Sequence, residues 1–140
     1  MAALSFAART RHPEVMQVLL GKSPRPEDQQ TRVDISLSKQ RAVLWKNDRV
    51  AMAAPVSTGR FGFATPYGRF VVTDKDPLRY STIYKVNMPY FMRLSCSEFG
   101  MHAGDVPNYP ASHGCIRLPR EAAIKFYKEV DLGTLVTIRP

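Results

Sequence analysis

The sequence predicts a mainly β domain, and three observations lead to this fold class. Apolar and polar residues alternate with a period of two from Val33 to Leu37, which is typical of a strand with one buried face. Two further strand-like runs are separated only by Asn47 and Asp48, a pair that favours a tight hairpin turn. Extended patterns continue to the end of the chain, whereas helical periodicity occurs in only two short places.

Residues 1–30 are expected to form a short N-terminal helix and a linker, separate from a domain over residues 31–140. In "HPEVMQVLLG", Pro13 and Glu14 suit the first turn of a helix, and Gly21 stands where a helix ends. Its apolar residues share one face: Val15, Val18 and Leu19. The stretch "KSPRPEDQQ" that follows is polar and broken by proline, as linkers are.

After the linker, strands account for most of the expected elements. The expected strands, in order, are residues 33–37, 41–46, 49–57, 69–73, 90–94, 99–102 and 134–138. A loop rich in glycine and proline precedes the fourth of them, at Gly59, Gly62, Pro66 and Gly68.

One late helix interrupts the strands, in "PREAAIKFYKEV". Pro119 and Glu121 suit its start. Its apolar residues recur at i, i+3, i+4 and i+7, the spacing of one helix face: Ala123, Phe126, Tyr127 and Val130.

Size and composition are those of an ordinary soluble domain. The chain has 140 residues, of which 44% are hydrophobic and 23% charged, enough to bury a core. The longest apolar run, "VMQVLL", is far too short to span a membrane, so no transmembrane segment is expected. The start "MAALSFAART" lacks the pattern of a secretory signal, so either export uses another route or the sequence begins after its leader.

The net charge of +8, from 20 Lys and Arg against 12 Asp and Glu, favours a polyanionic partner. Nucleic acid, anionic lipid and an acidic cell-wall glycopeptide all meet that description. The positive residues form no run of five or more, so most are expected to be solvated surface.

The stretch "MHAGDVPNYPASHGCIRLP" concentrates the reactive side chains. A cysteine acts as a nucleophile only as thiolate, and imidazole is its usual base. His102 ends an expected strand thirteen residues before Cys115, a loop long enough to return the chain to it. Gly114 permits a tight turn in which the amides of Gly114 and Cys115 form an oxyanion hole. The sequence therefore predicts that Cys115 is a catalytic thiol.

A metal site and a disulfide are the two alternative hypotheses for these histidines and cysteines. Four zinc ligands exist in principle, namely Cys96, His102, His113 and Cys115, but no C-x2-C or H-x3-H pair occurs, so no metal is expected. Cys96 has no flanking histidine or glycine turn and reads as a small buried apolar residue. A disulfide between Cys96 and Cys115 would remove the free thiol that the nucleophile needs. We therefore expect Cys96 to be buried or distant from Cys115.

The segment "SHGCIRLP" resembles the active-site signature of the L,D-transpeptidase catalytic domain family, in which a histidine precedes a Ser/Thr-His-Gly-Cys segment. The resemblance extends in order through "VDISLSKQRAVLWKNDRV", "APVSTGRFGFATPYGRFVV", "MPYFMRL" and "GTLVTI". It covers about residues 32–138, nearly all the chain after the linker.

The resemblance implies a mainly β, sandwich-like fold and acyl transfer on peptidoglycan stem peptides, without a cofactor. Cys115 would attack the carbonyl between residues three and four of a tetrapeptide stem and release the terminal D-alanine. An amine of a second stem would then attack the thioester and form a 3–3 cross-link. His102 would be the base, oriented by the carbonyl of Ala103, and the amides of Gly114 and Cys115 would hold the oxyanion.

The resemblance gives less definite roles to four other residues. Ser112 matches a motif position, His113 would shape the pocket or bind substrate, and Arg117 would order the loop or meet a stem carboxylate. Tyr90 is a candidate for the substrate cleft. Only nine residues separate His102 from Ser112, which would trim one wall of the cleft, and Ala103 stands where Gly or Ser is common.

The implied partners are donor and acceptor stem peptides rather than nucleic acid, for a monomer in the periplasm or cell envelope. Other functions remain open at this point. Some relatives in the family attach a lipoprotein to the wall, and others use water as the acceptor. The use of water here would make the chain an L,D-carboxypeptidase. A non-catalytic peptidoglycan-binding domain would suit the scattered positive charge. A cytosolic metal or redox protein would use Cys96 and Cys115.

Overall fold

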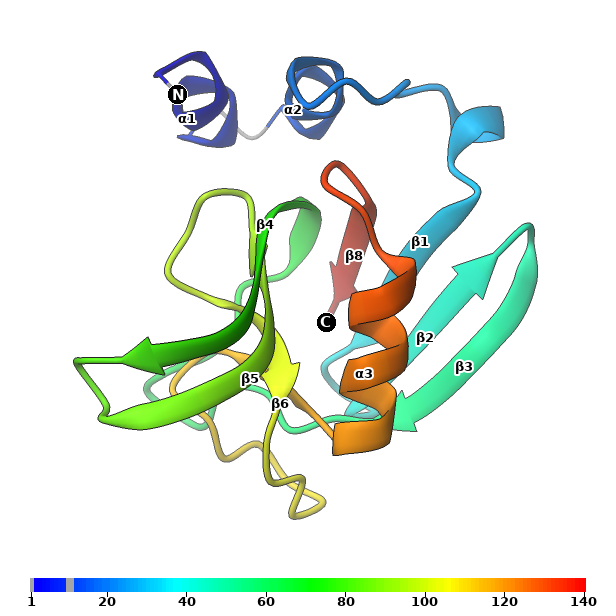
Figure 1. The fold of residues 1–140 in the computed structure, drawn as a ribbon. Coiled ribbons are helices and arrows are strands. Elements are labelled where there is room, and N and C mark those ends of the chain that lie inside the picture. The colour runs from blue at the N-terminus through cyan, green and yellow to red at the C-terminus, as the bar shows by residue number, and fades with distance from the viewer. Residues whose placement is uncertain (1, 10–11) are drawn as a thin grey trace.

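The computed structural model describes residues 2–9 and 12–140, and within them the chain is mainly β (Figure 1). The helices are α1 (Ala2–Arg9), α2 (Pro13–Leu19), the short 3-10 helix η1 (Pro26–Asp28) and α3 (Arg120–Glu129). The strands are β1 (Thr31–Ser36), β2 (Arg41–Lys46), β3 (Arg49–Pro55), β4 (Gly68–Ser81), β5 (Val86–Leu94), β6 (Gly100–Ala103), β7 (Ile116–Leu118) and β8 (Leu135–Arg139).

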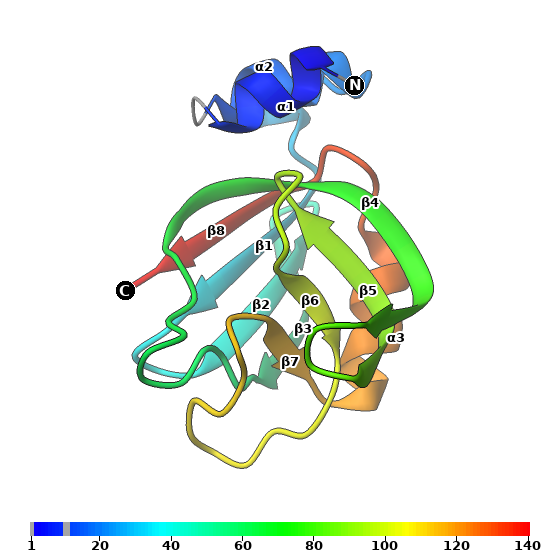
Figure 2. The same cartoon turned by 90° about the vertical axis from the view of Figure 1, so that its left-hand side faces the viewer.

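The strands form one sheet in the order β3-β2-β1-β8-β4-β5-β6-β7. β1 is parallel to β8 and β6 is parallel to β7, and the other neighbours are antiparallel. The 14-residue β4 belongs to both halves of the sheet. Its residues 68–71 pair with β8, and from Val72 onward it pairs with β5, with a bulge between Val72 and Asp74. Figure 2 shows β4 arching from one half to the other. The expected sandwich is therefore one sheet folded over at β4.

The two edges of this sheet meet next to the sequence motif. Ser57, just after β3, and Arg117 of β7 exchange backbone hydrogen bonds of 3.1 and 2.9 Å. Gly59 and Ser112 form a second bridge nearby. The residues that follow β3 are thus attached to the segment that carries Cys115.

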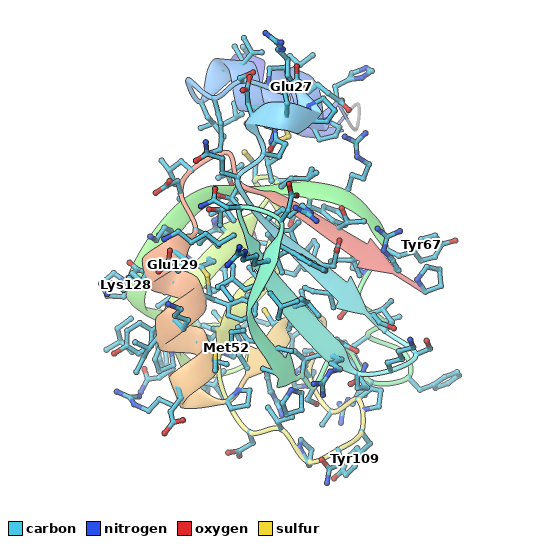
Figure 3. All side chains as sticks on the ribbon, turned by 90° about the vertical axis from the view of Figure 1, so that its right-hand side faces the viewer. Glu27, Met52, Tyr67, Tyr109, Lys128 and Glu129 are labelled. Atoms are coloured by element: carbon cyan, nitrogen blue, oxygen red, sulfur yellow. The ribbon has the colours of Figure 1, made fainter. Side chains whose placement is uncertain are left out.

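The core lies between the two halves of the sheet and α3. Val33 and Leu44 come from one half, Met92 and Met101 from the other, and Phe126 from α3, and all are fully buried. Burying a side chain of the size of Phe126 stabilises the fold by about 1.5–3 kcal/mol. Helix α3 contacts β3, β5 and β6, and Figure 3 shows Lys128 and Glu129 on it, with Met52 of β3 lower down. The helix thereby holds the motif-bearing strands against the core.

The expected hairpin at Asn47 and Asp48 is present, with left-handed φ angles of 52° and 61° that suit a two-residue turn. The strand expected at residues 69–73 is longer in the structure, because β4 continues to Ser81. The next strand, β5, begins at Val86 rather than at residue 90. Most of the large apolar side chains in this extension are exposed, so no alternation marked it in the sequence. We call residues 78–88 the cleft hairpin.

The N-terminal segment packs on the sheet through residues that the sequence pattern did not single out. The predicted helix is present as α2, but Val15 and Val18 are exposed, and Met16 and Gln17 are buried instead. Gln17 Nε2 donates to Gly133 O and to Gln29 Oε1, both at 2.9 Å. Helix α1, which the sequence analysis did not predict, adds Leu4 and Ala7 to a small core with Met16 and Val71. No helix in residues 2–9 and 12–140 is long and apolar enough to cross a membrane.

Candidate active site

His102 lies in β6, whose four residues are all buried. Its Nδ1 is 2.7 Å from the carbonyl oxygen of Ala103. Because a carbonyl only accepts hydrogen bonds, Nδ1 carries the proton and Nε2 is left as the acceptor. The backbone of the next residue therefore fixes the tautomer of the imidazole.

Cys115 directly precedes β7 and lies beside the start of β6. The parallel register pairs Met101 with Ile116 and His102 with Arg117, which brings Cys115 next to Gly100. A hydrogen bond from the Gly100 backbone reaches the thiol. Cys115 and His102 line the same cleft of about 590 Å³. The sheet topology thus joins two residues that are thirteen positions apart in the sequence.

Burial shifts the pKa values of both His102 and Cys115 toward their neutral forms. It raises the pKa of the Cys115 thiol, against the smaller opposing effects of the Gly100 hydrogen bond and of Arg117, Arg79 and Arg93. It lowers the pKa of His102, and Arg117 lowers it further, while the Ala103 carbonyl opposes both. Burial therefore favours a thiol at Cys115 and a neutral imidazole at His102.

The turn that carries the thiol is braced by side chains. Gly114 has φ of +122°, a conformation that favours glycine. Ser112 Oγ accepts the Gly114 N–H at 3.1 Å and donates to Cys115 O at 2.5 Å. Thr65 Oγ1 donates to Gly114 O at 2.7 Å. The Gly114 amide, which was expected in the oxyanion hole, is already bound by Ser112.

Three of the sequence phrases meet behind this turn. Gln40 and Thr58 form two hydrogen bonds, from Gln40 Nε2 to Thr58 Oγ1 at 2.7 Å and from Thr58 N to Gln40 Oε1 at 3.1 Å. The carbonyl of Thr58 then accepts the N–H groups of Ala111 and Ser112 at 3.1 and 3.0 Å. The residues around Gln40, Thr58 and Ser112 therefore form one hydrogen-bonded support for the thiol.

His113 is exposed, lines the same cleft as Cys115 and lies in an aromatic setting. Its ring stacks on Tyr84 with centroids 4.0 Å apart and 5° between planes, and meets Phe63 edge-on at 4.9 Å. Arg60 Nη2 is 3.4 Å from His113 Nε2. Local desolvation by the neighbouring rings lowers the pKa of His113, and the charges of Arg60 and Arg117 lower it further. His113 therefore joins the thiol-bearing turn to the cleft hairpin.

The cleft hairpin supplies one wall of the cleft, through residues 79–84, 86 and 88. Sequence reasoning missed this wall, including Arg79 and Tyr84. A run of exposed aromatic and apolar residues was the available signal, at Leu78, Tyr80, Ile83, Tyr84 and Val86.

Tyr90 does not line the cleft, contrary to expectation. Its φ of +56° interrupts the strand's alternation, so Met88 lines the cleft while Tyr90 turns toward the core. There its ring lies 5.6 Å from that of Tyr127 and below the guanidinium of Arg120.

Cys96 is also placed differently from expectation, because it is exposed rather than buried. Ser95 and Cys96 both have left-handed φ angles in the turn between β5 and β6, and Thr73 Oγ1 accepts the Cys96 N–H at 3.0 Å. Both cysteines are free thiols. Within the described residues, no three His, Cys, Asp or Glu side chains are grouped as metal ligands.

Arg117 lines the cleft, and the loop between His102 and Ser112 extends away from it. Figure 3 shows Tyr109 of this loop at the lower edge of the molecule. The loop is attached at Ser57, whose Oγ donates to Tyr109 O at 2.7 Å and accepts the Ala111 N–H at 3.1 Å.

Comparisons with known proteins identify the family to which this folded β sheet, with His102 and Cys115 in one cleft, belongs. The family model of the L,D-transpeptidase catalytic domain, YkuD, matches residues 30–138. The chain belongs to this family.

Individual relatives resemble parts of the chain. A Bacillus licheniformis relative bearing the YkuD L,D-transpeptidase name is 28% identical over 78% of this chain and 66% of its own. A solved L,D-transpeptidase from Stackebrandtia nassauensis is 27% identical, with a TM-score of 0.72 over 79% of this chain and 57% of its own. One from Mycobacterium smegmatis is 21% identical, with a TM-score of 0.75 over 79% and 59%, and shares the fold. The chain thus spans less than two thirds of these relatives.

Proposed function

We propose that this chain is a cysteine-dependent acyltransferase that acts on peptidoglycan stem peptides in the cell envelope. The observation that carries the proposal is the contact from His102 Nδ1 to Ala103 O, because it leaves Nε2 as a base in the cleft that holds Cys115. Family membership supplies the substrate class.

In the first half-reaction Cys115 attacks the L,D peptide bond before the terminal D-alanine. The thiol proton moves to His102 Nε2 as the bond from sulfur to carbon forms. The tetrahedral intermediate collapses, the carbon–nitrogen bond breaks, and the same proton goes to the leaving amine of D-alanine. A thioester to Cys115 remains.

In the second half-reaction an acceptor amine attacks the thioester and regenerates the thiol. An amine on the side chain of a second stem would yield a 3–3 cross-link. His102 takes a proton from the attacking amine and returns it to sulfur, so the enzyme ends as it began. An amine on a protein would attach that protein to the wall, and water would release a tripeptide.

Because burial favours the neutral pair, we assign the transfer of the thiol proton to the attack step. Negative charge then appears on the carbonyl oxygen of the substrate. We assign its stabilisation to the amide of Cys115, since Ser112 already binds the amide of Gly114.

Acylation by a carbapenem tests the proposal. Wild-type protein should gain the mass of one β-lactam by intact-mass spectrometry, and peptide mapping should place it on Cys115. The Cys115→Ala variant should gain nothing, whereas Cys96→Ala, which removes the exposed thiol, should react like wild type.

Purified tetrapeptide stems, with and without an added amine acceptor, then identify the second half-reaction. Dimer formation indicates transpeptidation, and tripeptide alone indicates an L,D-carboxypeptidase. If wild type neither acylates nor changes the tetrapeptide, the proposed function is wrong.

A further inference from the structure

A second cavity, of about 520 Å³, adjoins the catalytic cleft and takes no part in the proposed reaction. We call it the second pocket. Residues of three separate segments line it: Pro13 and Met16 of α2, residues 67–70 at the start of β4, and Ser95 and Ser97 after β5. Its volume lies within the usual range of pockets that hold small ligands. Because the family model begins at residue 30, the side formed by α2 lies outside the matched domain.

The second pocket and the catalytic cleft share two of their lining residues, Pro66 and Phe99. The Phe99 ring meets Phe70 edge-on, with centroids 5.3 Å apart and 88° between planes, which holds Phe99 in place. A polymer that leaves the cleft past Pro66 and Phe99 therefore enters the second pocket. The two cavities are thus placed to hold two parts of one substrate.

The second pocket combines aromatic rings with hydroxyl groups. Tyr67, which is 65% exposed, and the paired rings of Phe70 and Phe99 supply the aromatic surface. Ser95 Oγ accepts the Val71 N–H at 3.1 Å, and among the described residues no acceptor takes the hydroxyl proton of Ser95. A sugar ring has apolar C–H groups on its faces and hydroxyls around its rim, so it suits a site with both kinds of group.

The charges at the second pocket cancel, which disfavours an anionic ligand. Among the described residues that line it, Arg69 is the side chain with a permanent charge, and its Nη1 is 2.6 Å from Glu14 Oε1. A paired guanidinium still offers its other N–H groups as donors, but it adds little net attraction for a phosphate or a carboxylate. An uncharged polar ligand therefore fits this environment better than an anion does.

We propose that the second pocket binds the glycan strand to which the donor stem peptide is attached, so that the enzyme recognises sugar as well as peptide. The inference rests on the proposed function for the identity of the polymer. The N-terminus of each stem is joined by an amide to the lactyl group of an N-acetylated amino sugar, so the strand carries no charge at that point. Its chemistry matches an uncharged site with aromatic rings and hydroxyl donors.

The length of the stem places its sugar close to the cleft. The scissile bond follows the third residue of the stem, and three extended residues span only about 10 Å. When the scissile carbonyl is at Cys115, the sugar must therefore lie at an edge of the cleft. The second pocket meets the cleft at such an edge, at Pro66 and Phe99.

Titration with a neutral oligomer of N-acetylglucosamine tests the second pocket without any peptide. The amide resonances of isotope-labelled protein report where the sugar binds. We expect changes in chemical shift at Gly68, Ser95 and Ser97, and none at Tyr109, which lines neither cavity. Inorganic phosphate should cause no such changes. The absence of these changes with the sugar, or equal changes with phosphate, would overturn the proposal.

Variants of Tyr67 test the aromatic surface. Tyr67→Ala removes an exposed ring, and we expect it to weaken sugar binding about tenfold, the equivalent of about 1.4 kcal/mol. Tyr67→Phe keeps the ring and should retain most of the affinity. Tyr109→Ala is the matched control, because Tyr109 is 60% exposed and Figure 3 shows the two tyrosines at different edges of the molecule. An unchanged affinity in Tyr67→Ala would contradict the proposed site.

Turnover then links the second pocket to catalysis. The KM of a free tetrapeptide stem is compared with the KM of the same stem on its amino-sugar disaccharide. We expect the disaccharide form to have a KM about tenfold lower. Tyr67→Ala should remove this advantage and leave the KM of the free tetrapeptide unchanged. Equal KM values for the two substrates in wild type would refute recognition of the glycan.

The binding and turnover measurements separate this inference from the proposed function. If the sugar binds at the second pocket and neither substrate is turned over, the glycan site stands and the proposed acyl transfer fails. If both substrates are turned over equally and the sugar causes no change in chemical shift, the acyl transfer stands and the glycan site fails.

Discussion

Thr65 Oγ1 donates a hydrogen bond to Gly114 O at 2.7 Å and accepts one from Gly59 N at 2.8 Å. This buried hydroxyl joins the loop before β4 to the turn that carries Cys115. Gly59 lies so close to the backbone of Phe63 that a Cβ there would collide with it. The position of the nucleophile therefore depends on a residue fifty places earlier in the chain.

Replacing Thr65 by Val keeps the shape of the side chain but removes both hydrogen bonds. We expect the free energy of unfolding to fall by about 1–3 kcal/mol, because a buried carbonyl and a partly buried N–H lose their partner. Acylation of Cys115 by a carbapenem should slow as well. Thr65→Ser keeps the hydroxyl and should stay near wild type in both assays. A Val variant as stable and as fast as wild type would contradict this account.

His102 makes stability depend on pH in a defined direction. Burial lowers its pKa in the folded state, so below the ordinary value of about 6.5 the unfolded chain binds more protons at this residue. The free energy of unfolding should therefore decrease as pH falls from 7 toward 5, by up to about 1.4 kcal/mol per pH unit from this group.

Urea unfolding at several pH values measures this dependence. The slope over pH 5–7 should decrease in His102→Gln and remain in His12→Gln, whose histidine is exposed. An unchanged slope in His102→Gln would show that other groups cause it.

The stacking of Tyr84 on His113 predicts a role for the cleft hairpin in substrate binding. Tyr84→Ala removes the ring that lies 4.0 Å from the imidazole, which frees the hairpin from the thiol-bearing turn. We expect KM for a tetrapeptide donor to rise several-fold with little loss of stability, since Tyr84 is exposed. Tyr84→Phe keeps the stacked ring and should retain the wild-type KM. Equal KM values in wild type and Tyr84→Ala would rule this out.

Met16 predicts that the N-terminal segment contributes to the stability of the domain. Its side chain is buried against Leu4, Ala7 and Val71, so Met16→Ala should reduce the free energy of unfolding by about 2–5 kcal/mol. Val15→Ala, one position earlier on the exposed face, should cost little. Denaturant unfolding of both variants measures the two changes in stability. A Met16 variant as stable as the Val15 variant would mean that α2 folds as an independent appendage.

Local patterns were sufficient for much of the fold. Period-two alternation located β1, and the Asn47-Asp48 turn located the hairpin of β2 and β3. The spacing of Ala123, Phe126 and Val130 located α3, whose residues Ala123 and Phe126 are fully buried. β1 and α3 were predictable because one face of each is buried in the core, which imposes a regular period on the sequence.

Features without such a period could not be predicted. The cleft hairpin exposes both faces, so the full lengths of β4 and β5 left no alternation. A positive φ turned Tyr90 from the cleft to the core, and two positive φ angles brought Cys96 to the surface. Gln17 is buried only because Gly133 and Gln29, both distant in sequence, bind its amide.

The sequence by itself determined the strand-rich class of the fold and the residue types that suit a thiol nucleophile and its base. Only the tertiary structure decided which groups those residues meet. The tautomer of His102, the engagement of the Gly114 amide by Ser112, and the placement of Arg79 beside Cys115 arise where separate strands converge. The physical reason is that periodicity reports burial of one face of an element, whereas hydrogen bonds and charges depend on partners that chain folding alone brings near.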